Sequence, residues 1–141
     1  MNPKSSLGKL VVAAAIVAAS LLLSGCRGAK LSTANEQMER GEYFDAAKTY
    51  RKIYNKLTKR EERPQRGEVA WKMAECHRRL NQFARASAAY QNAARYGYPD
   101  STLYLHLAQM LHAEGKYAPA VKAYSDYLAW RPDDKLAQNG L

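Results

Sequence analysis

The sequence predicts an all-α solenoid of about three helix–turn–helix repeats, and two observations support this fold class. A short motif that begins at Gly41 occurs again at Asn81 and at Gly115, so the copies are 40 and then 34 residues apart. After each copy, residues of similar size and polarity follow at matching positions. One such unit cannot bury its apolar face alone, and about three stacked units are needed for a stable core.

The matching positions indicate how the helices pack. They hold an aromatic residue, an alanine and a tyrosine in turn: Tyr43, Ala46 and Tyr50; Phe83, Ala86 and Tyr90; and Tyr117, Ala120 and Tyr124. The alanines, with Ala74 and Ala108 in the preceding helices, let two helices approach closely, and the tyrosines fill the space between units. Gly41 and Gly115 suit the left-handed turn that ends a first helix, and Asn81 is the next best residue there.

The third unit also carries Leu107–Ala108 in its first helix and Pro132–Asp134 at its end. Together with the aligned aromatics and alanines, these motifs resemble the tetratricopeptide repeat (TPR) family over about residues 30–134. The resemblance implies three TPR repeats, at about residues 30–60, 67–100 and 101–134. It also implies that the first helices line a concave groove in which a protein partner binds.

Three segments depart from the repeat pattern. The first helix of the first unit has a weak apolar stripe, with Thr33 and Gln37 in it, and would suit a polar N-terminal cap. The second unit starts late, and the extra residues, around 59–64, should extend a helix or a loop on one edge. Residues 135–141 should begin another helix, either as a short cap or as the start of a longer, truncated solenoid.

Residues 1–25 are predicted to be a signal peptide. Lys4 and Lys9 precede an uncharged apolar run, Leu10–Leu23, which is too short to span a bilayer comfortably. The run ends in Leu23–Cys26, which resembles the lipobox of bacterial lipoproteins. The resemblance implies a diacylglycerol on the Cys26 thiol and an acyl chain such as palmitate on its amino group, with residues 26–29 as a lipidated linker. No other cofactor is expected. An uncleaved anchor and an ordinary signal are the alternatives.

A narrower resemblance concerns the lipobox together with the sequence from Gly41 to Asp134, including Ala74–Arg78 and Gly97–Asp100. These segments resemble the N-terminal TPR module of Bacteroidetes OmpA-family outer-membrane lipoproteins of the PorE type, which are linked to type IX secretion. The resemblance implies lipid attachment and a scaffold role on the outer membrane, facing the periplasm. Arg27 replaces the aspartate that retains enteric lipoproteins in the inner membrane. Peptidoglycan binding would require downstream domains and is assigned to no residue of this chain.

Positive charge is concentrated in the middle of the chain. There are 22 Lys and Arg residues against 13 Asp and Glu residues, which gives a formal net charge of +9. We define the basic band as six residues in the densest part: Lys52, Lys56, Lys59, Arg60, Arg63 and Arg66. Because an exported protein does not meet nucleic acid, the band would bind anionic lipid, a cell-wall polymer or an acidic protein face. The alternative is a set of solvated helix faces with no partner.

Aligning the units predicts which side chains line the groove. The first unit supplies Asn35, Met38 and Glu39, the second Trp71, Glu75, Arg78 and Arg79, and the third Leu105, Gln109 and His112. Trp71 beside Arg78 and Arg79 would grip a peptide with an aromatic plate and two guanidinium groups that pair with carboxylates. Alternatively, Trp71 packs between helices and the arginines are merely solvated.

The carboxylate clamp of chaperone-binding TPR domains is not expected here. By resemblance, that clamp uses Lys, Asn and Arg at fixed groove positions. Only Asn35 matches it, whereas Leu31 and His106 do not. Binding of an EEVD-type tail therefore does not transfer to this chain.

The sequence does not predict an enzyme. Cys76 stands at a position that is usually small and buried, and His77 is expected to pack against the second helix. His106 and His112 are six residues apart, on different helical faces, and cannot share a metal ion. The sequence contains no Gly-rich phosphate loop and no nucleophile elbow.

Three functions remain. The first is an outer-membrane-anchored TPR lipoprotein that acts as a protein–protein interaction scaffold in a type IX secretion or envelope-anchoring complex. The second is a TPR lipoprotein that assists outer-membrane protein assembly or cell-wall enzymes. The third is a structural module that binds anionic lipid or glycan through the basic band.

Overall fold

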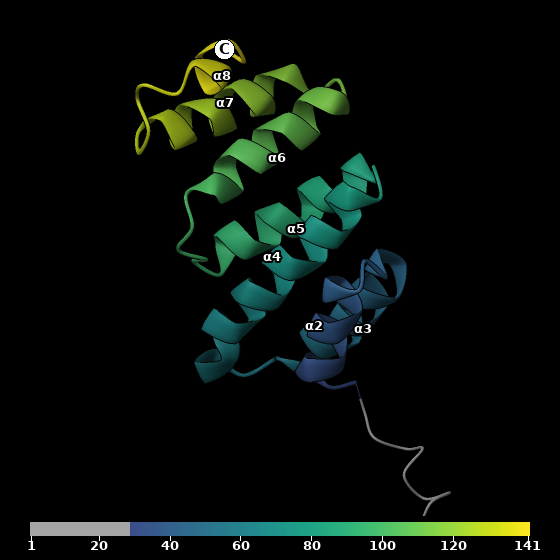
Figure 1. Ribbon diagram of the computed structural model, residues 1–141. Coiled ribbons are helices and arrows are strands. Elements are labelled where there is room, and N and C mark those ends of the chain that lie inside the picture. The colour runs from purple at the N-terminus through teal and green to yellow at the C-terminus, as the bar shows by residue number, and fades with distance from the viewer. Residues whose placement is uncertain (1–28) are drawn as a thin grey trace, which may run out of the picture.

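The computed structural model describes residues 29–141, and in this part of the chain the secondary structure is entirely helical (Figure 1). The elements are α2 (Leu31–Glu39), α3 (Tyr43–Lys56), the 3-10 helix η2 (Arg60–Glu62), α4 (Arg63–Arg79), α5 (Phe83–Arg95), α6 (Thr102–Ala113), α7 (Tyr117–Leu128) and α8 (Lys135–Gln138). Cys26, Arg27 and the predicted signal peptide lie outside the described residues. A search of the described helices finds none whose length and hydropathy would let it cross a bilayer.

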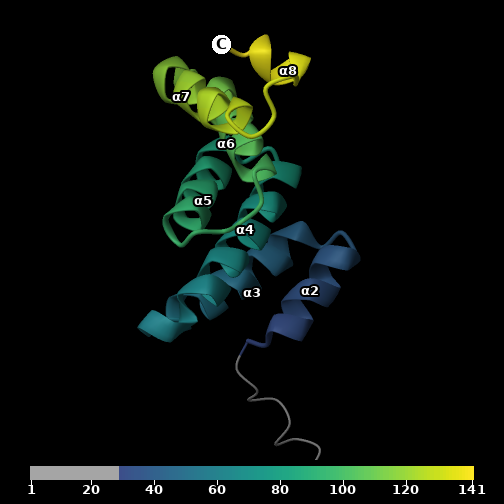
Figure 2. The same ribbon diagram turned by 90° about the vertical axis from the view of Figure 1, so that its left-hand side faces the viewer.

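The helices form three stacked hairpins, α2–α3, α4–α5 and α6–α7, and each helix packs on the next one in the chain. Figure 1 shows the hairpins rising in order from the N-terminal to the C-terminal end, with α8 against α7. In Figure 2 the second helix of each hairpin is labelled to the left of its first helix: α3 to the left of α2, α5 to the left of α4, and α7 to the left of α6. This two-layered stack confirms the predicted all-α solenoid of three helical hairpins.

The same turn geometry closes each hairpin. Gly41, Asn81 and Gly115 have φ angles of 77°, 54° and 75°, as the sequence predicts. In the middle hairpin, the Gln82 N–H donates to the His77 carbonyl at 2.9 Å and the Asn81 N–H donates to the Arg78 carbonyl at 3.1 Å. The first and third hairpins repeat both hydrogen bonds. These bonds satisfy the last carbonyls of each first helix and fix where it ends.

The core contains the small and aromatic residues that recur in the sequence. Tyr50 and Tyr90 are fully buried and Tyr124 is 6% exposed, so each fills space next to a neighbouring helix. The five aligned alanines are also buried: Ala46, Ala74, Ala86, Ala108 and Ala120. Close helix contact at the alanines and large apolar burial at the tyrosines together hold neighbouring units in contact.

The segments that depart from the repeat lie at the edges of the solenoid. Residues 59–64 contain η2 and the first two residues of α4, which is the longest described helix, at 17 residues. In α2, Ala34 alone is buried. At the other end, the Asp134 carboxylate accepts hydrogen bonds from the backbone N–H groups of Leu136 and Ala137, at 3.0 and 3.1 Å, and begins α8.

Candidate peptide-binding groove

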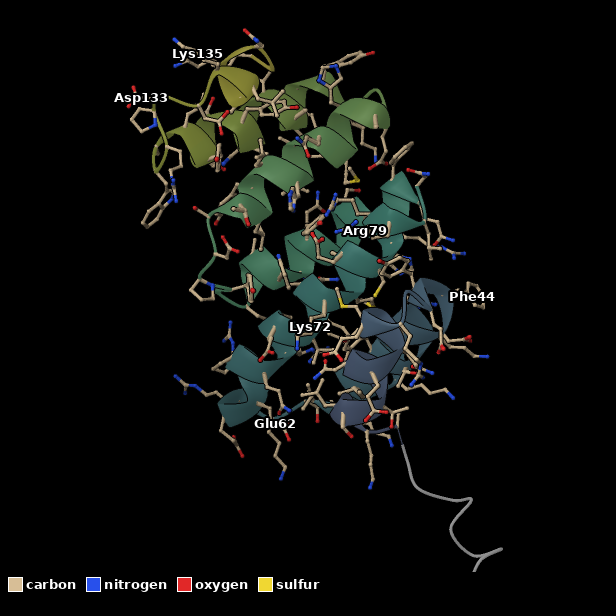
Figure 3. The ribbon with its side chains drawn as sticks, viewed as in Figure 1. Phe44, Glu62, Lys72, Arg79, Asp133 and Lys135 are labelled. Atoms are coloured by element: carbon tan, nitrogen blue, oxygen red, sulfur yellow. The ribbon has the colours of Figure 1, made fainter. Side chains whose placement is uncertain are left out.

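A hollow of about 350 Å³ lies between α2 and α4, the first helices of two neighbouring units. Figure 3 shows Lys72 and Arg79 on the part of α4 that passes α2. The first helices stack side by side, so the hollow is the part of the predicted groove that lies between the first two units. Its walls are formed by Asn35, Met38, Glu39, Tyr43, Tyr50, Lys72 and Arg79.

Asn35 is the centre of the polar contacts in the hollow. Its Oδ1 accepts hydrogen bonds from the Tyr50 hydroxyl at 2.7 Å and from the Lys72 ammonium at 3.1 Å. The same ammonium lies 3.1 Å from the Glu68 carboxylate. Because both neighbours occupy the amide oxygen, the Asn35 NH₂ group remains as a donor, and Lys72 has a third N–H to offer. The hollow therefore presents hydrogen-bond donors that would suit a carbonyl or carboxylate oxygen.

The rim of the hollow carries one charge of each sign. Arg79 of α4 and Glu39 of α2 are both exposed. Met38, which lines the same hollow, is half-buried, with its sulfur 3.7 Å from the Tyr50 hydroxyl. The two charged groups can form directional ion pairs with a ligand, and the flexible Met38 side chain can form apolar contacts next to them.

Glu75 lies beneath the groove surface, only 6% exposed. Its carboxylate is 2.7 Å from the Arg78 guanidinium and 2.9 Å from the His106 ring, and it accepts a hydrogen bond from the Tyr90 hydroxyl. Burial alone would raise the pKa of Glu75, but hydrogen bonds from His106, Arg78 and Tyr90 lower it to about 2. Glu75 therefore holds Arg78 in place and does not itself present a surface to a partner.

Trp71 packs against a neighbouring aromatic ring and does not line the hollow. It is half-buried, and its ring stacks on Tyr98 with the centroids 5.1 Å apart and the planes 16° from parallel. Its indole Nε1 is buried and makes no hydrogen bond within residues 29–141. One face of the indole is thus packed against Tyr98, which holds the ring in a defined orientation at the side of the groove.

The predicted groove residues of the third unit lie apart from the hollow. Leu105 and Gln109 are half-buried on α6. His112 is exposed, and its ring meets Tyr117 edge-on with the centroids 5.3 Å apart. The hollow thus brings together residues of the first two units and none of these three.

The basic band divides into a surface part and a packed part. Lys52, Lys56, Lys59, Arg60 and Arg63 are exposed, whereas Arg66 is half-buried. The Arg66 guanidinium carbon lies 4.4 Å from the Tyr54 ring centroid and 5.0 Å from that of Tyr96. Arg66 therefore holds α3, α4 and the end of α5 together through cation–π contacts.

Cys76 and His77 are both buried, as the sequence predicts. Burial raises the pKa of the Cys76 thiol to about 12, which leaves it protonated and unreactive at neutral pH. The His77 Nδ1 lies 2.8 Å from the Gln82 side-chain oxygen at the start of α5. Within the described residues, no group of three or more His, Cys, Asp or Glu side chains is arranged to hold a metal ion.

Three residues line the hollow but are missing from the predicted groove set: Tyr43, Tyr50 and Lys72. A signal for Lys72 is present in the sequence: it is seven residues before Arg79, so the two share one face of α4. The hydrogen bond between Lys72 and Asn35 joins residues 37 positions apart, and only the stacked structure reveals it.

Comparison with known proteins agrees with this fold. Residues 68–101 match the model of the tetratricopeptide repeat family, so the second unit of the chain is a TPR repeat. The structure resembles the first TPR domain of Spaghetti (RPAP3) bound to the HSP90 peptide SRMEEVD, with a TM-score of 0.59 and 22% sequence identity. That match covers 77% of this chain and 81% of the other. No curated protein matches the sequence.

These findings define the class of protein. The described chain has the fold of a TPR solenoid, and TPR domains mediate protein–protein interactions. The comparisons indicate no enzyme family.

Proposed function

We propose that this protein is a scaffold whose groove, between α2 and α4, holds an extended segment of a partner protein. The observation that carries the proposal is the set of hydrogen-bond donors in the hollow. The Lys72 ammonium donates a hydrogen bond to the Asn35 side chain, and the exposed Arg79 lines the same hollow. Hydrogen-bond donors of this kind recognise main-chain carbonyls and carboxylates. The similar TPR domain was solved with a peptide bound, which supports the same use of the fold here.

The bound segment would differ from a chaperone tail. Leu31 and His106 stand where a carboxylate clamp has cations, and the His106 ring faces the Glu75 carboxylate at 2.9 Å. Arg78 is also paired with Glu75. The available contacts are therefore the Asn35 amide, the Lys72 ammonium and Arg79, which suit a main-chain segment with one acidic residue.

We also propose that the protein is a lipoprotein of the outer membrane that faces the periplasm, with its acyl chains on Cys26. The support is the lipobox Leu23–Cys26 and the PorE-type resemblance, which together favour a role in a type IX secretion or envelope-anchoring complex. Two or more acyl chains give stable membrane attachment. Labelling with radioactive palmitate tests this part, because Cys26→Ser should abolish the label.

Photo-crosslinking in the native host tests the groove. A photoreactive amino acid at Met38 should give partner adducts that disappear in the Lys72→Gln, Arg79→Gln double variant. The matched control is Arg95→Gln, Arg131→Gln, which removes two exposed cations outside the hollow and should leave the adducts intact. Adducts that survive the groove variant would contradict the proposal. Adducts to secretion proteins would favour the first function, and adducts to barrel-assembly proteins or cell-wall enzymes the second.

A second candidate function is contact with an anionic membrane surface through the basic band. The helix α2 begins at Leu31, and α3 runs back alongside α2 to Lys56, so Lys56 and the following Lys59 and Arg60 lie at the same end as the start of α2. Figure 3 shows the neighbouring Glu62 at this end of the molecule. A lipid on Cys26 would place these cations near the phospholipid head groups. Salt-sensitive sedimentation with phosphatidylglycerol vesicles, lost in Lys56→Gln, Lys59→Gln, Arg60→Gln, would support this function.

A further inference from the structure

A second pocket, of about 130 Å³, lies at the edge where the α2–α3 and α4–α5 hairpins meet. It shares no residue with the hollow between α2 and α4. Its walls come from α3, from the end of α4 and from the start of α5. Figure 3 shows Phe44, one of its wall residues, projecting from the ribbon at this edge.

Three cations surround the pocket. Lys48 and Arg51 come from α3 and Arg85 from α5, and all three are exposed. None of them forms an ion pair with a carboxylate of the described residues, and no acidic side chain lines the pocket. Like charges this close repel one another, and an anionic ligand would relieve that repulsion.

The inner wall is polar and uncharged. Burial lowers the pKa of His77, and the charges of Arg51 and Arg85 lower it further, against a raising contribution from its hydrogen bond with Gln82. The Gln82 side-chain oxygen lies 2.8 Å from His77 Nδ1 and 3.4 Å from an Arg85 guanidinium nitrogen. Gln82 thus connects the neutral imidazole to the guanidinium at the pocket mouth.

The pocket also has an apolar side. Phe44 is 62% exposed, an unusual state for a phenylalanine on a helix that packs in a solenoid. Ala47 and the half-buried Leu80 continue this surface inward. Apolar area next to unpaired cations suits a ligand that carries both an apolar group and a negative charge.

We propose that this pocket is a second binding site, which takes a partner's peptide segment with one apolar side chain flanked by carboxylates. The volume is below the roughly 300–1,000 Å³ typical of small-molecule sites and fits a single side chain. Arginine guanidinium groups bind carboxylates in a bidentate manner, and Arg51 and Arg85 flank the entrance on two sides. The site goes beyond the proposed groove function, since it needs neither Lys72 nor Arg79.

The test is a titration of the full chain in neutral detergent, with the histidine rings labelled with ¹³C. The probe is the peptide acetyl-Asp-Leu-Asp-amide. We expect a saturable shift of the His77 resonance, with the shifts of His106 and His112 much smaller. Two control peptides each lack one set of contacts: acetyl-Asn-Leu-Asn-amide has no carboxylates, and acetyl-Asp-Gly-Asp-amide has no apolar side chain. Each should bind about tenfold more weakly.

Two double variants with the same loss of charge make the test specific. Arg51→Gln, Arg85→Gln should weaken acetyl-Asp-Leu-Asp-amide binding about tenfold or more, since two charged hydrogen-bond partners are lost. Arg95→Gln, Arg131→Gln removes two exposed cations outside the pocket and should leave binding unchanged. Equal weakening by both variants, or equal binding of the uncharged peptide, would overturn the proposal. So would a His77 shift produced by phosphatidylglycerol in the micelles and not by the peptide.

Discussion

The Glu75 carboxylate on α4 lies 2.9 Å from Nδ1 of His106 on α6, so a buried acid of the second unit contacts the third. Tyr90 of α5 donates to the same carboxylate, and Arg78 of α4 pairs with it. In a solenoid each unit contacts only its neighbours, so stability depends on contacts at every interface. Glu75 therefore links three helices across the interface between the second and third units.

Replacing Glu75 by Gln should destabilise the fold by about 3 kcal/mol, because it leaves Arg78 and His106 without their buried partner. Urea denaturation followed by circular dichroism measures the loss. Glu68→Gln is the matched control on the same helix, since Glu68 is 47% exposed and its ion pair with Lys72 should contribute less than about 1 kcal/mol. An equal loss of unfolding free energy in the two variants would show that the buried contacts of Glu75 stabilise the fold no more than the exposed ion pair of Glu68.

Stability should also fall in acid because of Glu75. Its pKa is about 2 in the folded chain, whereas an unfolded glutamate has a pKa of about 4.3. A lowered folded pKa stabilises the protein above the unfolded value, and this stabilisation is lost as the pH falls from about 4.5 towards 2. The free energy of unfolding, obtained from denaturation curves across this pH range, should fall more steeply with falling pH in the native chain than in Glu75→Gln. The same pH dependence in the two proteins would contradict the lowered pKa of Glu75.

Arg66 should matter for stability more than its neighbours in the basic band. Arg66→Ala removes a guanidinium that packs on Tyr54 and Tyr96, and should cost about 1–2 kcal/mol. Arg66→Lys should recover part of this loss, because lysine keeps the charge but not the planar group. The control is Arg60→Ala, an exposed band position, which we expect to lie within about 0.5 kcal/mol of the native chain. Thermal melts rank the three variants.

The sequence predicts the repeated parts of this structure well because their causes are local. Gly41, Asn81 and Gly115 have positive φ for reasons contained in a single turn, and the spacing of the alanines and tyrosines follows from helical geometry. The helical spacing and the size of these residues are visible within one unit, and the other two copies of the unit support the same prediction.

The candidate site was predicted less completely because it depends on contacts between units. The sequence predicts Glu75 as a groove residue, but it does not line the hollow, and its carboxylate is buried against partners from α5 and α6. The bond between Lys72 and Asn35 likewise joins two units. Arg66 appears in the sequence as one charge among many, and its aromatic neighbours are distant in the chain. Such pairs become visible only when the hairpins are stacked.

The stack between Trp71 and Tyr98 gives a prediction that can be read by fluorescence. The chain has two tryptophans, and Trp130 is 71% exposed, so a Trp130→Phe background reports on Trp71 alone. In that background Tyr98→Ala should uncover one face of the indole, shift its emission to longer wavelength and destabilise the fold by about 1 kcal/mol or more. Tyr98→Phe keeps the stacked ring and should preserve both properties. If Tyr98→Ala leaves the emission unchanged, the Trp71 ring is oriented by other contacts and not by this stack.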